Sequence, residues 1–147
     1  YIYIDSKKMR IHKDSDKKIK IIAGKFGDVE GPVKNHNIEP IYFDVEIEKN
    51  KDSNFEIPIT HNSFIYLIKG EIKIGDKNHK KVKDSTLILL ANGNNLKVKG
   101  IIKSKFLLIS GKPIGEPIAR GGPFVMNTKE EILKAVKDYH SGNFVKK

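Results

Sequence analysis

Hydrophobic and polar residues alternate with a period of two along most of this 147-residue chain. This period places neighbouring side chains on opposite faces of the backbone and is typical of half-buried β-strands. The segments that show it, and that we expect to be strands, are 18–23, 41–48, 64–74, 86–91, 96–98 and 105–110. Parallel strands in one sheet need crossover connections, usually helices, and the segments between these strands leave no room for them. The pattern therefore favours an antiparallel sandwich or jelly-roll barrel.

Glycine, proline and asparagine separate these segments, and two of the glycines allow specific predictions. Gly70 interrupts the longest alternating run, which predicts a bend or bulge where one ribbon passes between two sheets. Asn92-Gly93 is a tight-turn signal, because both residues tolerate the positive φ of a type I′ hairpin.

The period changes only near the C-terminus, where a single helix is predicted from about Thr128 to His140. Thr128 and Glu131 have the spacing of a capping box, in which each side chain binds the backbone N–H of the other residue. Apolar residues then share one face, and Gly142 is placed to end the helix. The members of that face are Ile132, Leu133, Val136 and Tyr139.

Composition narrows the class of protein. The chain has no cysteine, which excludes disulfides and thiolate metal sites and is compatible with a reducing compartment. No apolar run approaches the ~20 residues that span a bilayer, and the N-terminus does not resemble a signal peptide. The net charge of +10 raises the possibility of nucleic-acid binding, but almost all of it comes from lysines that alternate with apolar residues. Such spacing is typical of a solvated strand face, so nucleic-acid binding is the less favoured hypothesis.

The sequence contains no recognisable catalytic constellation. Its histidines are isolated, and no His-x-His pair with a following Glu is present, as a metal-binding barrel would need. These histidines are His12, His36, His61, His79 and His140. A glycosidase would need two convergent carboxylates, but Asp44, Glu46 and Glu48 alternate along one strand and are expected to be solvated. Most aromatic residues are expected to pack in the core, notably Phe43, Phe64, Tyr66, Phe106 and Phe124.

One long segment, 115–132, is distinctive: GEPIARGGPFVMNTKEEI. It resembles the C-terminal signature of the pirin family, which leads into the last helix. Further stretches around 21–34, 61–71 and 107–113 fit the same half of that family in the same order. The residues that carry the signature, to which we assign a structural role, are Glu116, Pro117, Gly122, Pro123, Phe124, Asn127, Thr128 and Glu131.

The resemblance implies an all-β fold, a cupin double-stranded β-helix (jelly-roll) barrel with one C-terminal helix. Residues 1–16 would be an interdomain connector or first strand, and 17–147 the C-terminal cupin domain of a two-cupin (bicupin) protein. It also implies that an N-terminal barrel is missing here and that this barrel holds the family's iron. No position of this sequence matches those iron ligands, so we assign no catalytic, cofactor-binding or metal residue to this chain.

The favoured hypothesis is therefore a metal-free C-terminal cupin domain that supports an iron-bearing N-terminal barrel and offers a surface to proteins. The parent protein would be a quercetin 2,3-dioxygenase-type oxygenase or a transcriptional co-regulator. The alternative is a barrel that binds a small molecule, or acts as a dioxygenase, in its own right. Expected partners are the protein's own N-terminal cupin domain and transcription-related proteins, without membrane or nucleic acid, in the cytoplasm or nucleus.

Overall fold

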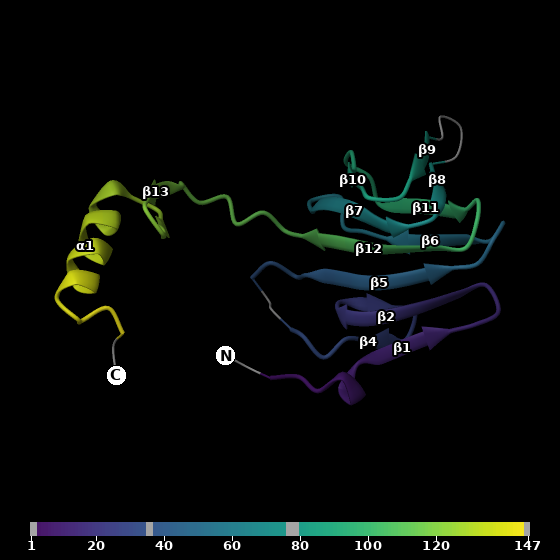
Figure 1. Ribbon diagram of the computed structural model, residues 1–147, viewed down its shortest axis with the longest axis horizontal. Coiled ribbons are helices and arrows are strands. Elements are labelled where there is room, and N and C mark those ends of the chain that lie inside the picture. Colours follow the sequence, from purple (N-terminus) through teal and green to yellow (C-terminus); the bar gives the residue numbers. More distant parts are fainter. Residues whose placement is uncertain (1–2, 35–36, 76–79, 146–147) are drawn as a thin grey trace. The chain divides into compact units, whose positions relative to one another are not determined.

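The computed structural model describes residues 3–34, 37–75 and 80–145, and the chain forms two compact units. The first unit is Tyr1–Pro113 and the second is Ile114–Lys147. Figure 1 shows both units. No helix in the described part of the chain is long and apolar enough to cross a membrane.

The first unit is built on a six-stranded antiparallel sheet in the order β1-β2-β5-β12-β7-β10 (Figure 1). Its strands are β1 (Arg10–Lys13), β2 (Lys17–Ala23), β5 (Ile41–Ile47), β12 (Ser104–Gly111), β7 (Asn62–Lys69) and β10 (Thr86–Leu89). A short 3-10 helix, Ser6–Lys8, precedes β1. Strands β2 and β5 bury every second residue, as their alternating sequences predict.

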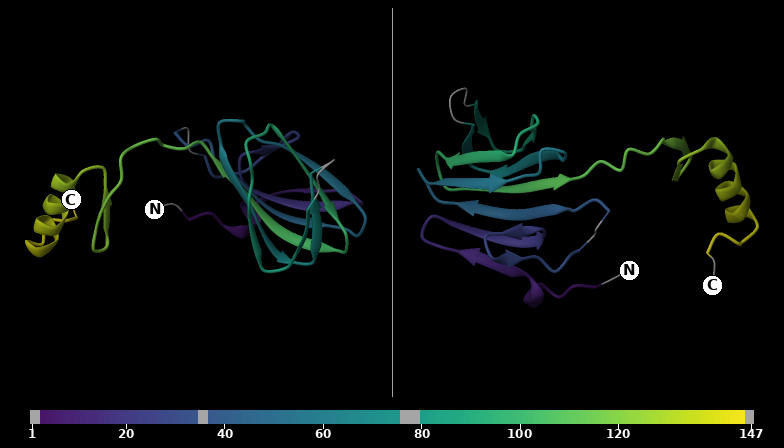
Figure 2. Two further views of the ribbon diagram at one scale, coloured as in Figure 1. Left: turned by 90° about the horizontal axis from the view of Figure 1, so that it is seen from above. Right: turned by 180° about the vertical axis from the view of Figure 1, so that it is seen from behind.

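A four-stranded antiparallel sheet in the order β6-β11-β8-β9 covers the inner face of the six-stranded sheet. Its strands are β6 (Asp52–Glu56), β11 (Asn95–Gly100), β8 (Glu71–Ile74) and β9 (Lys80–Lys83). The left view of Figure 2 shows the strands of both sheets wrapping around a shared interior. A small hairpin of β3 (Lys25–Phe26) and β4 (Val29–Glu30) completes the unit.

The hydrophobic core lies between the two sheets and holds Phe43, Phe106, Phe55 and the inward Ile, Leu and Val residues. Phe55 lies between Phe43 and Phe106, with ring centroids 6.3 Å and 6.1 Å away, so aromatic contacts join β6 to the larger sheet. The predicted core position is confirmed for Phe43 and Phe106. It is wrong for Tyr66, which is 40% exposed on the outer side of β7, and for Phe64, which lies on the same side of that strand.

Gly70 separates β7 from β8 and lets one ribbon serve both sheets, as predicted. Its φ of +106° lies in a region that side chains with a Cβ rarely adopt. Ser104 packs so closely that a Cβ on Gly70 would lie 2.7 Å from the Ser104 Cα. Glycine is therefore required both by the backbone angle and by the space.

The predicted all-β architecture with one C-terminal helix is confirmed. The prediction of a hairpin at Asn92-Gly93 is wrong. β10 pairs with β7, whereas β11 pairs with β6 and β8, so this turn connects two sheets. Strands β1, β6 and β9 were not predicted, because each carries too few apolar residues to show alternation.

The second unit contains a hairpin of β13 (Ala119–Gly121) and β14 (Phe124–Met126), followed by α1 (Lys129–His140). The helix begins and ends as predicted, with Thr128 as N-cap and Gly142, at φ +75°, just past its end. Ala135 is its one buried residue among those described.

Candidate functional site

The signature residues lie in the second unit and hold the entry to α1. Asn127 donates from Nδ2 to Glu116 Oε2 at 2.7 Å and to the Pro117 carbonyl at 3.2 Å. These two bonds tie the segment before the β13–β14 hairpin to the segment that follows it. Gly122 occupies the hairpin turn with φ +56°, next to Pro123.

The capping box predicted from Thr128 and Glu131 is present. Glu131 Oε2 accepts from the backbone N–H groups of Asn127 and Thr128, both at 2.9 Å, and Thr128 Oγ1 accepts from the Glu131 N–H at 3.2 Å. Phe124 contacts Tyr139 and Phe144, with ring centroids 6.1 Å and 5.3 Å away. These contacts form a helix cap and a small aromatic cluster, whereas the structural role assigned to the signature residues stays a prediction.

This second unit leaves much of its apolar surface uncovered. Leu133 and Tyr139 on α1 are 70% and 64% exposed, although the sequence pattern placed them on the apolar face of the helix. Ile118 before β13 and Val125 in β14 are also exposed. These exposed apolar side chains belong to the unit Ile114–Lys147.

A second apolar surface lies on the outer side of the six-stranded sheet. Cross-strand pairing sets Leu107, Tyr66 and Leu87 in one row, and Ile109, Phe64 and Leu89 in the next. We call this surface the outer apolar face. Its members are Tyr42, Phe64, Tyr66, Ile68, Leu87, Leu89, Leu107 and Ile109.

The outer apolar face reaches an unprotected sheet edge. Leu87 and Leu89 belong to β10, an edge strand of this sheet, and are 56% and 77% exposed. Edge strands normally carry charged or proline residues that prevent association. The outer apolar face thus extends to a strand that pairs on one side only within the described part of the chain.

At the opposite side of the outer apolar face the surface becomes charged. Asp44 and Glu46 point outward from β5, and Lys105 Nζ lies 3.4 Å from Asp44 and 3.7 Å from Glu46. Glu48 just beyond the strand pairs with Lys103 at 2.6 Å. Each of these acids has a lysine partner. The prediction of a solvated strip is confirmed for Glu46 and Glu48 but is wrong for Asp44, whose side chain is 19% exposed and whose Oδ1 is buried.

The outer face of the four-stranded sheet is basic. Lys73 stands directly opposite Lys81 on β9 and Lys99 on β11. Asp52, opposite Lys99 on β6, is 3.8 Å from its ammonium group. The expected solvated lysine face is thus present, with three like charges in one row.

The mouth of the barrel holds the one buried histidine among the described residues. His61 precedes β7, is 5% exposed, and places Nδ1 3.1 Å from the Ser110 hydroxyl on β12. Ser63 donates to the same hydroxyl at 2.8 Å. His61 Nε2 is also buried and has no hydrogen-bond partner in the described part of the chain.

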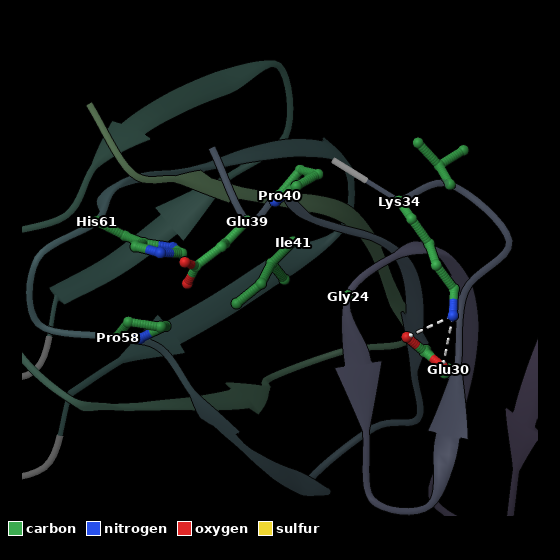
Figure 3. A pocket seen from close by; sticks show the side chains of 9 residues that line it. Gly24, Glu30, Lys34, Glu39, Pro40, Ile41, Pro58 and His61 are labelled. Carbon is green, nitrogen blue, oxygen red and sulfur yellow. Dashed lines mark hydrogen bonds and ion pairs between the residues drawn. The ribbon is translucent and has the colours of Figure 1, made fainter. Parts of the chain in front are cut away.

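His61 lines a cavity of about 210 Å³ at this mouth, where β2 ends and β5 begins. Figure 3 shows Glu39 and His61 in this cavity, with the Glu39 carboxylate pointing toward the histidine ring. Pro40, Ile41 and Pro58 form its apolar walls. Lys34, which also lines the cavity, forms an ion pair with Glu30, with Nζ 3.2 Å from Oε1.

Iron in a cupin barrel needs three or four convergent His or carboxylate ligands. Within residues 3–34, 37–75 and 80–145, no group of three or more such side chains is close enough to hold a metal ion. The groups bonded around His61 are serine hydroxyls, so the donor set does not fit iron. His12 belongs to β1 and His140 to α1, whereas His36 and His79 lie outside the described residues. Absence of metal from this barrel stays a prediction.

Among the described carboxyl groups, the one with a strongly lowered pKa lies in a turn. Asp14, between β1 and β2, accepts from the backbone N–H groups of Asp16 and Lys17 at 2.8 Å and 2.9 Å. These bonds, the Asp16 N–H foremost, hold the pKa of Asp14 well below its usual range. Lys51 lowers the pKa of Asp16 through a hydrogen bond. Both acids stabilise local structure.

Comparison with known proteins identifies the relatives of this chain. Residues 42–145 match the family described as the pirin C-terminal cupin domain. Over 104 residues the chain is 36% identical to a pirin-like protein of Solanum lycopersicum and to pirin of Homo sapiens. Each alignment covers 69% of this chain and 36% of the relative. The structure is also similar to the crystal structure of quercetin 2,3-dioxygenase from Acinetobacter baumannii, with 28% sequence identity and a TM-score of 0.83. The superposition covers 96% of this chain and 49% of the Acinetobacter chain.

The relatives are longer than this chain. Two proteins of Pseudomonas aeruginosa, each 30% identical over 129 residues, are covered to 45% and 44% of their length. The chain thus spans about half the length of the curated relatives that it matches.

Proposed function

Because this chain belongs to the pirin family, we propose that it is the C-terminal cupin half of a two-cupin protein and acts as a docking partner. Its role is to support and partly cover an N-terminal barrel that carries the iron. The outer apolar face is the observation that carries this proposal. It offers two rows of apolar side chains on a sheet surface that a monomeric domain would keep polar.

A second cupin half of the same protein is the occupant that best suits this face. The matched relatives are about twice as long as the chain, so they contain a further segment of similar size. Flat sheet surfaces pack well against one another when their side chains are apolar. The apolar surface of the second unit, around Leu133 and Tyr139, would add to the contact with that half or receive other proteins.

The activity belongs, in this proposal, to the parent protein. A quercetin 2,3-dioxygenase-type reaction is favoured by the similarity to the Acinetobacter baumannii enzyme. Transcriptional co-regulation through protein contacts is the other role that the family resemblance suggests. In either case this half supplies surface and stability, because its barrel lacks a set of three convergent metal ligands within the described residues.

Metal analysis and turnover test this division of labour. The chain, and the full-length gene product that contains it, are loaded with Fe²⁺, desalted, and assayed for bound iron and for quercetin consumption. We expect substoichiometric iron and no turnover above a no-protein control for the chain alone, with both present in the full-length protein. Stoichiometric iron in the chain that is lost in His61→Ala would contradict the proposal and favour a self-sufficient dioxygenase.

A further inference from the structure

The mouth of the barrel holds a buried polar atom that has no partner among the described residues, and an exposed carboxylate lines the same cavity. His61 Nε2 is buried without a hydrogen bond to the described residues, whereas Glu39 is exposed and its carboxylate forms no hydrogen bond or ion pair with them. An unsatisfied buried donor or acceptor costs about 1–3 kcal/mol, so folded proteins seldom keep one without a use. Glu39 also has a φ of +46°, a strained backbone conformation for a residue with a Cβ.

The hydrogen bonds behind His61 are compatible with a tautomer that carries the hydrogen on Nε2. Ser63 donates its hydroxyl hydrogen to Ser110 Oγ, which leaves the Ser110 hydrogen free to point at His61 Nδ1. In the tautomer in which Nδ1 accepts that hydrogen, a neutral imidazole carries its own hydrogen on Nε2. This is the tautomer that the proposal below requires, and in it Nε2–H is the donor of His61.

A ligand that satisfies both groups must accept from the His61 N–H and donate to the Glu39 carboxylate. A hydroxyl group does both with one oxygen atom. Anions are disfavoured by the carboxylate, and Lys34 does not offset this because Glu30 already pairs with it. The walls formed by Pro40, Ile41 and Pro58 suit an apolar body behind the hydroxyl.

The size of the cavity limits the ligand to a small molecule. A volume of about 210 Å³ corresponds to roughly seven water molecules at ~30 Å³ each. Typical sites for drug-sized ligands begin near 300 Å³, so a single ring with one substituent is the appropriate scale. We propose that the mouth cavity is a binding site for a small, uncharged alcohol whose hydroxyl bridges His61 Nε2 and the Glu39 carboxylate.

Titration with two matched ring compounds tests this site by NMR. Cyclohexanol offers both an acceptor and a donor, whereas tetrahydropyran offers an ether acceptor without a donor. We expect saturable shifts of the Gly24, Ile41 and His61 signals with cyclohexanol at millimolar Kd, and about five- to tenfold weaker binding of tetrahydropyran. A long-range ¹H–¹⁵N spectrum should show His61 protonated at Nε2.

Two variants assign the two hydrogen bonds separately. His61→Phe removes the donor and should weaken both compounds about fivefold or more, whereas His140→Phe, the same change in the second unit, should weaken neither. Glu39→Gly removes the carboxylate and relieves the positive φ, so it keeps the fold even if His61→Phe does not. It should weaken cyclohexanol about fivefold and leave tetrahydropyran unchanged.

The outcomes separate this site from the docking role. No saturable shift up to the solubility of cyclohexanol would overturn the proposal, and so would a His61 protonated at Nδ1. Equal binding of both compounds to the wild type and to Glu39→Gly would also overturn it. None of these results depends on whether the chain docks against another cupin half.

Discussion

Replacing Gly70 with alanine is the sharpest test of how this barrel is built. A Cβ at this position would meet Ser104 Oγ, Cα and Cβ, the closest backbone contact being 2.7 Å. The Ser104 hydroxyl donates to the Ile102 carbonyl at 2.8 Å and accepts from the Glu71 N–H at 3.1 Å, so it has little room to withdraw. The substitution therefore strains both the backbone and the packing where the ribbon changes sheets.

The change in the free energy of unfolding caused by Gly70→Ala is the sum of two destabilising effects and one stabilising effect. A φ of +106° for a residue with a Cβ costs roughly 1–3 kcal/mol, and overpacking costs about 1–3 kcal/mol more. Alanine lowers the entropy of the unfolded chain, which returns about 0.4–1 kcal/mol. We expect Gly70→Ala to lower the free energy of unfolding by about 2–5 kcal/mol, a large part of the ~5–15 kcal/mol typical of a domain.

Urea denaturation followed by circular dichroism measures this loss, and two other glycines provide matched controls. Gly75 has a φ of +82° but open space around its Cβ position, so Gly75→Ala should cost only the backbone strain. Gly93 has neither constraint, and Gly93→Ala should be nearly neutral. If Gly70→Ala is no more destabilising than Gly75→Ala, the close packing of Gly70 on Ser104 is wrong.

Three further predictions concern the cap, the basic face and the β1–β2 turn. Thr128→Ala removes the cap hydrogen bond and should lower the stability of α1 by about 1 kcal/mol, whereas Ser141→Ala at the other end should have a smaller effect on helical circular dichroism. Lys73→Glu replaces two like-charge pairs with opposite-charge pairs and should raise the free energy of unfolding by about 0.5–2 kcal/mol at low salt. The gain should shrink at high salt, and Lys25→Glu, opposite Glu30, should destabilise instead; equal signs for the two would contradict the pairing. Because the folded pKa of Asp14 lies below its unfolded value, its stabilisation is complete above about pH 4 and disappears as the pH falls toward the folded pKa. In Asp14→Ala the free energy of unfolding should therefore fall less steeply as the pH is lowered below about 4 than in the wild type. The same fall in both proteins would refute the role of this turn.

Local patterns in the sequence predicted the strands that alternate strongly and the helix with its cap. Both signals depend on residues that are close together in the sequence. In β2 and β5 every second residue is buried, and the capping box joins Thr128 to Glu131, three positions away. The bend at Gly70 was also predictable, because a glycine inside a long alternating run commonly marks a bulge or a tight bend. These are all consequences of short-range order.

What the sequence could not predict depends on contacts between distant segments. The bond between His61 and Ser110 joins residues 49 positions apart, so an isolated histidine gave no sign of being buried. The outer apolar face needs the register of β5, β12, β7 and β10, which turns Tyr66 and Leu107 outward together. Strand β6 was missed because one of its two inward residues is Ser53, a polar side chain.

Photo-crosslinking from the outer apolar face tests the central claim most directly. A crosslinking amino acid is placed at position 89, on β10, in the full-length gene product, with position 81 on the lysine row as a matched control. The account predicts an intramolecular crosslink from position 89 to a cupin segment outside residues 1–147, and none from position 81. Equal crosslinking at both positions, or no crosslink from position 89 to such a segment, would contradict the docking role of this face.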